Sequence, residues 1–200
     1  MRKAEQPCMA EAVTDNVYWV GAVDWDLEEF HGYLTQRGTT YNAFLLMGKD
    51  GVTLVDTVKK SRQEEMMSRI RSVIDPGEIR FIVSNHAEMD HSGSLPAVMD
   101  IIGPEQVFAS AKGVQALDEH FGLGNRLTEV RNGQEVCLGG RALTFLETKM
   151  IHWPDSMVSF LKEDGVLFSQ DAFGMHLATS QLFADQNDRA VLKWEADKYY

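Results

Sequence analysis

Residues 85–93 read Asn-His-Ala-Glu-Met-Asp-His-Ser-Gly, directly after the apolar run Phe81-Ile82-Val83. Four side chains that commonly bind metal ions fall within six residues here: His86, Glu88, Asp90 and His91. Loops that follow buried strands reach out at the edge of a sheet, where ligands bind. Charged and imidazole groups crowded there would suffer repulsion and desolvation unless a cation neutralised them. The segment therefore predicts a metal site; the alternative is a polar loop with solvated side chains.

Two further potential ligands also come soon after predicted strands. His152 lies in the loop after the strand expected at residues 142–146, and Asp171 follows the strand expected at residues 166–169. An aspartate can bridge two metal ions through its two oxygens, while neutral imidazoles fill terminal positions. We therefore interpret the six side chains as candidates for one site that holds two metal ions.

Turn signals and apolar periodicity divide the chain into two β-rich parts with helices between them. Strands are expected at residues 17–20, 41–47, 52–56, 81–83, 107–109, 136–138, 142–146, 158–161 and 166–169. Helices are expected at residues 60–74, 95–102, 114–121 and 188–200. This order predicts an α+β fold in one domain over residues 1–200, with two sheets covered by helices and a second half shorter than the first.

The net charge limits which partners the chain can bind, and the cysteine content indicates its redox compartment. Nineteen Lys and Arg residues against thirty Asp and Glu residues give a net charge of −11, which repels phosphate backbones and anionic membrane surfaces. No apolar stretch approaches the roughly 18 residues of a membrane span, and the N-terminus lacks the apolar core of a signal peptide. The two cysteines, Cys8 and Cys137, form no paired motif, which favours a reducing compartment. We expect a cytoplasmic protein with neither nucleic acid nor membrane as a partner.

The ligand pattern resembles that of a known superfamily. A His86-x-x-x-Asp90-His91 motif with a later His and Asp is similar to the metallo-β-lactamase superfamily, whose hydrolases carry HxHxDH; Glu88 stands where the second histidine would be. Four more segments extend the likeness: DWDLEEFHGY (24–33), GTTYNAFL (38–45), HWPDSM (152–157) and DAFG (171–174). From about Val17 to Tyr200 the chain resembles the N-terminal diiron domain of the flavodiiron proteins, of the rubredoxin:oxygen oxidoreductase type. The resemblance implies a metallo-β-lactamase-like αββα sandwich that is incomplete at its C-terminal end.

The resemblance also implies a role for each candidate ligand. The family pattern would place His86, Glu88 and His152 on one iron, Asp90 on the other, and Asp171 between them. His91 matches a position that binds iron in some members and swings away in others. The family's last ligand is a histidine well beyond the equivalent of Asp171. This chain has no histidine after His176, which does not match that position, so the second iron would lack one expected ligand.

The family reduces O2 to water, NO to N2O, or both, at its two iron ions. Its electrons come from rubredoxin or a flavoprotein through FMN, which a following flavodoxin-like domain carries in a head-to-tail dimer. These 200 residues contain no phosphate-cradling Gly-Ser-Thr loop followed by a helix, so we expect FMN in a missing domain and this chain to be an N-terminal fragment. We also expect a homo-oligomer or complex, because an early end to the second sheet exposes a strand edge. His31 and Tyr200 match positions that line the substrate pocket near the irons.

Two other functions compete with diiron chemistry. The first is a dinuclear zinc hydrolase of the metallo-β-lactamase superfamily, which would use a metal-bound hydroxide. Glu88 argues against this hydrolase, because a carboxylate in place of an imidazole favours iron that cycles between two oxidation states. Zinc also accepts carboxylate ligands, however, and can substitute for iron in such a site. The second is a noncatalytic fragment, which the missing histidine favours.

Overall fold

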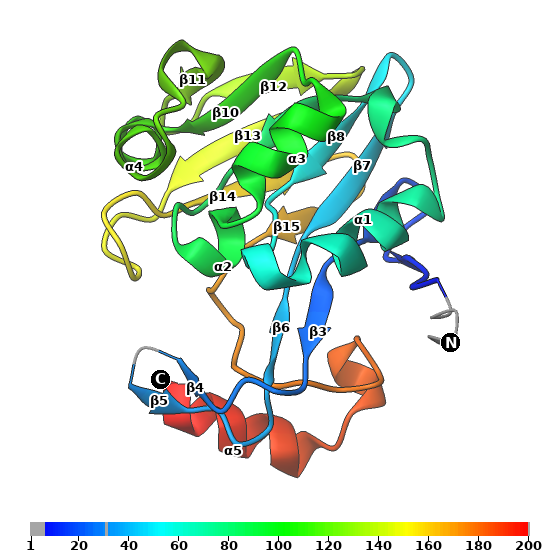
Figure 1. The fold of residues 1–200 in the computed structure, drawn as a ribbon, viewed down its shortest axis with the longest axis vertical. Helices are drawn as coiled ribbons and strands as arrows, with labels where there is room; N and C mark the ends of the chain where they lie inside the picture. Colours follow the sequence, from blue (N-terminus) through cyan, green and yellow to red (C-terminus); the bar gives the residue numbers. More distant parts are fainter. Residues whose placement is uncertain (1–6, 31, 200) are drawn as a thin grey trace, which may run out of the picture.

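Two β-sheets pack against each other in the part of the chain that the structure describes, which is residues 7–30 and 32–199 of a computed structural model (Figure 1). The larger sheet has the strand order β1-β2-β7-β8-β9-β10-β11, with antiparallel pairing from β1 to β8 and parallel pairing from β8 to β11. Its strands are β1 (Glu11–Ala12), β2 (Val17–Trp19), β7 (Phe44–Gly48), β8 (Gly51–Val55), β9 (Ile79–Val83), β10 (Gln106–Ser110) and β11 (Leu127–Val130). The smaller sheet is antiparallel and consists of β12 (Glu135–Leu138), β13 (Arg141–Glu147), β14 (Met157–Leu161) and β15 (Val166–Phe168).

The central strands of the larger sheet are buried on both faces. Leu45 of β7 packs under the helices, whereas the next residue, Leu46, packs between the two sheets. Leu54 and Val55 of β8 repeat this division. Successive side chains of a strand point to opposite faces, so consecutive apolar residues bury both sides of a sheet. The apolar runs therefore explain why this sheet lies in the middle of the molecule.

Three helices cover the outer face of the larger sheet. They are α1 (Gln63–Arg71), α3 (Leu95–Ile102) and α4 (Ala111–Phe121), and Figure 1 shows α1 and α3 lying across the strands. The 3₁₀ turns η1 (Lys60–Arg62) and η2 (Pro76–Glu78) flank α1, and η3 (Gly124–Arg126) follows α4. Met66, Met67 and Ile70 of α1 are fully buried in the core, and α1 lies within the helix predicted at residues 60–74.

The strand predicted at residues 41–47 was wrong as a single element. It divides at Asn42 into β6 (Thr39–Tyr41), which pairs with β3 (Ala22–Asp24), and β7 of the larger sheet. The Trp19 indole N–H donates to Asn42 Oδ1 at 2.9 Å, and Val20 N donates to Ala43 O at 2.8 Å, so the break has its own partners. The ribbon of β3 and β6 leads away from the sheets (Figure 1). It reaches β4 (Glu29–Phe30), β5 (Tyr33–Leu34) and α5 (Arg189–Tyr199), with η4 (Ala184–Gln186) before that helix.

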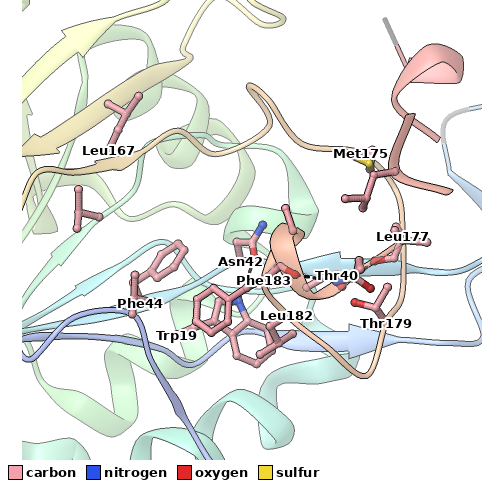
Figure 2. Close-up of a pocket in the computed structure, with 15 residues that line it drawn as sticks. Trp19, Thr40, Asn42, Phe44, Leu167, Met175, Leu177, Thr179, Leu182 and Phe183 are labelled. Atoms are coloured by element: carbon pink, nitrogen blue, oxygen red, sulfur yellow. Dashed lines mark hydrogen bonds between the residues drawn. The ribbon is translucent and has the colours of Figure 1, made fainter. Parts of the chain in front are cut away.

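The edge strand β15 of the smaller sheet borders an apolar cavity of about 360 Å³ (Figure 2). Among the described residues β15 pairs only with β14, and the exposed Leu167 on β15 lines the cavity. Trp19, Phe44 and Leu182 contribute much of the remaining apolar wall. None of the predicted metal ligands lies in this lining.

Among the described helices, none combines the length and apolarity needed to cross a bilayer.

An ion pair ties the β3–β6 ribbon to the helical layer. Asp24 is 5% exposed; it accepts a hydrogen bond from the Tyr41 hydroxyl at 3.0 Å and another from the Arg62 guanidinium. Burial alone would raise the pKa of Asp24, but the hydrogen bonds from Arg62 and Tyr41 outweigh it and leave the pKa lowered. A carboxylate whose pKa is lower in the folded state stabilises that state above its unfolded pKa of about 3.9, and the contribution disappears as the pH falls through the folded value.

We therefore expect Asp24→Asn to destabilise the protein at neutral pH and to flatten the loss of stability below about pH 4. Urea unfolding at a series of pH values measures both effects. Asp26→Asn is the matched control, because Asp26 also faces Arg62, at 3.3 Å, but its side chain is 90% exposed and such pairs contribute at most about 1 kcal/mol. Equal effects of the two substitutions would contradict the prediction.

Candidate metal centre

The six predicted ligands converge on one edge of the two sheets. His86 and Glu88 follow β9, Asp90 and His91 lie in the short helix α2 (Met89–Ser92), His152 follows β13 and Asp171 follows β15. They form two groups that share Asp171: His86, Glu88, His152 and Asp171 in the first, and Asp90, His91 and Asp171 in the second. Within each group the candidate ligand atoms all lie within 4.8 Å of one another. The structure brings all six side chains together, and their role as metal ligands stays a prediction.

In the first group, two imidazoles face two carboxylates. Glu88 Oε2 lies 3.1 Å from both His86 Nε2 and His152 Nε2. Asp171 Oδ2 lies 3.1 Å from His152 Nε2 and 3.4 Å from His86 Nε2. His86 and Glu88 are buried, whereas the His152 side chain is 48% exposed, so solvent reaches the group from the His152 side.

The second group lies on the other side of Asp171. His91 Nε2 is 2.9 Å from Asp171 Oδ1 and 3.7 Å from Asp90 Oδ2. Asp171 thus presents Oδ2 to the first group and Oδ1 to the second. A carboxylate placed in this way can bind one metal ion through each oxygen.

The segment from residue 86 to residue 94 is not a continuous loop, because the short helix α2 forms within it. The backbone is extended at Glu88, with φ −61° and ψ 148°, and then makes a single helical turn through Asp90 and His91. The Ser92 hydroxyl donates to Ala87 O at 2.7 Å and fixes the turn. Extended backbone followed by one helical turn distributes the donors of a single short segment over both groups.

The burial of so many charges creates strong electrostatic coupling. Burial raises the pKa of Asp90, and the negative charges of Asp171 and Glu88 raise it further. Burial would lower the pKa of His86, but hydrogen bonds to Asp155 and Glu88 raise it to about 9. Burial would likewise lower the pKa of His91, but the charges of Asp90 and Asp171 raise it to about 10. Protons and metal ions therefore compete for these imidazoles.

The donor set fits a pair of transition-metal ions. Asp90 Oδ1 and His91 Nδ1 are buried without a hydrogen-bond partner among the described residues. A buried carboxylate oxygen without a partner is costly unless a cation or donor compensates it. Mixed imidazole and carboxylate donors, two groups and one shared aspartate are the chemistry that iron, manganese or zinc accepts.

Two buried aspartates support the ligand segment, and the sequence assigned neither of them a role. Asp56, which directly follows β8, accepts hydrogen bonds from Asn85 N at 2.6 Å and from Asn85 Nδ2 at 3.1 Å. Asp155 Oδ2 accepts from Ala87 N at 2.7 Å and lies 2.9 Å from His86 Nδ1. The only sequence signals were an aspartate at the end of an apolar strand and an aspartate three residues after His152.

The two predicted pocket residues, His31 and Tyr200, lie outside the described residues. A small cavity of about 40 Å³ does border the second group. Its lining includes Thr39, Tyr41, Asp90, His91, Asp171, His176 and Tyr199. His176 Nδ1 lies 3.1 Å from Thr39 Oγ1, and its ring lies 5.5 Å from that of Tyr199.

Comparison with known proteins identifies the family. The family model described as "ODP family beta lactamase" matches residues 39–196. The chain belongs to the ODP family. This match includes all six candidate ligands of the two groups. It confirms the metallo-β-lactamase-like α+β fold.

The relatives that match this ODP-family chain include a nitric oxide reductase and a rubredoxin-oxygen oxidoreductase. The chain is 43% identical over 192 residues to the nitric oxide reductase of Moorella thermoacetica, with 94% of this chain and 48% of the relative covered. It is 42% identical over 193 residues to the rubredoxin-oxygen oxidoreductase of Megalodesulfovibrio gigas, with 96% and 48% covered. The chain thus spans about half the length of these relatives.

Solved ODP-family structures share the fold closely. The rubredoxin oxygen:oxidoreductase from Desulfovibrio gigas superposes with a TM-score of 0.92 at 42% identity, over 96% of this chain and 48% of that one. The flavodiiron protein from Giardia intestinalis gives a TM-score of 0.87 at 32% identity, over 98% and 47%. The resemblance to flavodiiron proteins inferred from the sequence motifs is confirmed.

Proposed function

We propose that this chain is the metal-binding part of a diiron oxidoreductase that reduces O2 to water, NO to N2O, or both. The observation that carries the proposal is the pair of donor groups joined by Asp171, with the Glu88 carboxylate in the first group. The names of the relatives, nitric oxide reductase and rubredoxin-oxygen oxidoreductase, support the same chemistry. A carboxylate-rich donor set favours iron over zinc, because hard anionic ligands stabilise the higher oxidation state.

The two groups supply the proposed ligands. His86, Glu88 and His152 would hold one iron, Asp90 and His91 the other, and Asp171 both. Of these, His91 has the least support, because its Nδ1 has no partner among the described residues to fix its ring. A histidine from a further segment would complete the second iron, as the family resemblance implies.

The residues around the second group would hold and shield a small substrate. When bound, the iron pair supplies electrons and a position at which O2 or NO can bind. The adjoining cavity of about 40 Å³ has room for a molecule of about that size. Tyr41 lines this cavity, and its hydroxyl donates a hydrogen bond to Asp24 Oδ2. Burial and the charge of Asp24 raise the pKa of Tyr41 well above its ordinary value, so the phenol remains protonated beside the cavity.

Turnover would depend on an external electron donor. Complete reduction of O2 to water consumes four electrons, two more than a pair of ferrous ions would supply. We propose that FMN, carried on a domain outside these 200 residues, and rubredoxin or a flavoprotein provide the remainder, in a homo-oligomer or complex. The relative named rubredoxin-oxygen oxidoreductase supports this donor class.

The test loads the chain with Fe²⁺ without oxygen and then adds O2 or NO in the presence of excess NADH. We expect two iron ions per chain and one brief burst of consumption, because NADH alone does not return single electrons to the irons. Sustained consumption without an added flavoprotein would overturn the requirement for a donor. Failure to bind iron would overturn the proposed function.

A second assay tests the alternative function, that of a zinc hydrolase. Zn²⁺-loaded protein is assayed with an activated thioester, a lactam and a phosphodiester, and we expect no hydrolysis above that of the metal-free protein. Metal-dependent hydrolysis together with no reaction of the iron form would reverse the assignment.

A further inference from the structure

Asp155 holds the outer nitrogen of His86. Its Oδ2 lies 2.9 Å from His86 Nδ1 and accepts a hydrogen bond from Ala87 N at 2.7 Å. Asp155 is 3% exposed and His86 is 1% exposed, so water does not compete for these contacts. On its other side, the His86 ring presents Nε2 to Glu88 and Asp171.

A carboxylate at Nδ1 determines which nitrogen of the ring carries the proton. A neutral imidazole has one N–H and one lone pair, and an ionised carboxylate can only accept. Once a metal ion takes the Nε2 lone pair inside the first donor group, the one proton of the neutral ring must lie on Nδ1, where Asp155 accepts it. Such outer partners also fix the ring orientation and increase the basicity of a ligand.

His91 provides a comparison within the same segment. Its Nε2 faces Asp171 Oδ1 at 2.9 Å, much as His86 Nε2 faces the first group. Its Nδ1, however, is buried and has no hydrogen-bond partner in the described part of the chain. The two histidines, five positions apart, therefore differ in the support of their outer nitrogen.

Asp155 is itself held rigidly between two strands. The Ser110 hydroxyl, at the end of β10, donates to Asp155 O at 2.7 Å. Two residues further along, Met157 N at the start of β14 donates to Asn85 O at 3.0 Å. The first bond fixes Asp155 to the end of β10, and the second fixes the residues that follow it to the segment of His86. The carboxylate is thus placed by the fold and not by a mobile loop.

We propose that Asp155 is a positioning residue that fixes His86 with its proton on Nδ1 and its Nε2 lone pair toward the metal. The inference rests on the proposed metal-binding function and adds a residue that touches no metal ion itself. Asp155 makes the first donor group the better organised of the two. Loss of partners of this kind typically costs about tenfold to a hundredfold in metal affinity.

The experiment compares wild type, Asp155→Asn and Asp155→Ala in the 200-residue chain, with Zn²⁺ and Co²⁺ as probes. Asparagine keeps a neutral oxygen acceptor in the same place, whereas alanine removes it. We expect the dissociation constant of the tighter ion, measured by competition with a chelator, to rise about tenfold to a hundredfold in the alanine variant and by less in the asparagine variant. In ¹⁵N-histidine NMR spectra of the Zn²⁺ form, wild-type His86 should show a protonated Nδ1 and a metal-bound Nε2, and the Nδ1–H signal should be lost or shifted in both variants.

Asp164→Ala is the matched control, because it also removes a largely buried carboxylate, one that pairs with Arg141 Nη1 at 2.6 Å and belongs to neither donor group. We expect it to lower the melting temperature without changing the His86 signals or the dissociation constant. If folded Asp155→Ala protein keeps the wild-type affinity and His86 spectrum, Asp155 has only a structural role and the inference fails while the proposed function stands. If wild-type chain binds neither probe, the proposed function fails and the inference fails with it.

Discussion

Replacement of Asp171 by alanine is expected to weaken both proposed metal positions at once. Among the described residues, Asp171 is the one that belongs to both donor groups, with Oδ2 3.1 Å from His152 Nε2 and Oδ1 2.9 Å from His91 Nε2. Its removal also leaves the remaining carboxylates and imidazoles without their common partner. We expect affinity for both ions to fall by more than about a hundredfold, because loss of a residue that merely supports a ligand already costs about tenfold to a hundredfold. Iron content per chain after gel filtration, together with chelator competition, measures the change.

Two single-group variants provide the controls for Asp171. Glu88→Ala removes a carboxylate from the first group alone, and Asp90→Ala removes one from the second group alone. Each should reduce the metal content toward one ion per chain, whereas Asp171→Ala should reduce it toward none. Circular dichroism establishes that each variant remains folded. If Asp171→Ala retained one ion with wild-type affinity, Asp171 would not be shared between the two positions.

The location of the site was predictable because the ends of the predicted strands determine where the ligand segments lie. Each ligand segment comes after an apolar strand, so the ends of β9, β13 and β15 specify where the donors emerge. Once the two sheets pack together, the loops that follow these strands meet at the same edge. The residue types alone then identify His86, His152 and Asp171 as candidates, without knowledge of any distance.

The supporting residues could not be predicted in the same way. Asp155 contacts His86 across a sequence separation of 69 residues, and no periodicity records that contact. The division of residues 41–47 into β6 and β7 depends on the Trp19 to Asn42 hydrogen bond, which is equally non-local. The strands β3, β4, β5 and β6 are each two or three residues long, too short to produce a hydrophobic pattern. Such features become visible only when the packed structure brings distant side chains together.

Asp56 should contribute more to stability than any of the residues that line the site, because its buried side chain accepts two hydrogen bonds and its backbone adopts a conformation that few residues tolerate. The side chain is buried and receives both hydrogen bonds from Asn85, at 2.6 and 3.1 Å. The backbone adopts a left-handed conformation with φ 58°, which costs most residues about 1–2 kcal/mol. Alanine would lose the acceptor, leave two buried donors unsatisfied and keep the unfavourable backbone.

We expect Asp56→Ala to lower the free energy of unfolding by about 3 kcal/mol, a large part of the roughly 5–15 kcal/mol typical of a domain. Asp56→Gly separates the two causes: it also loses the acceptor but relieves the backbone, so it should be more stable than the alanine variant by about 1 kcal/mol. Asp56→Asn tolerates the left-handed conformation and keeps one acceptor, so it should lose least. Urea unfolding of the three variants gives the order Asn, Gly, Ala from most to least stable. An alanine variant as stable as the asparagine variant would mean that Asn85 finds other partners and that Asp56 does not anchor the ligand segment.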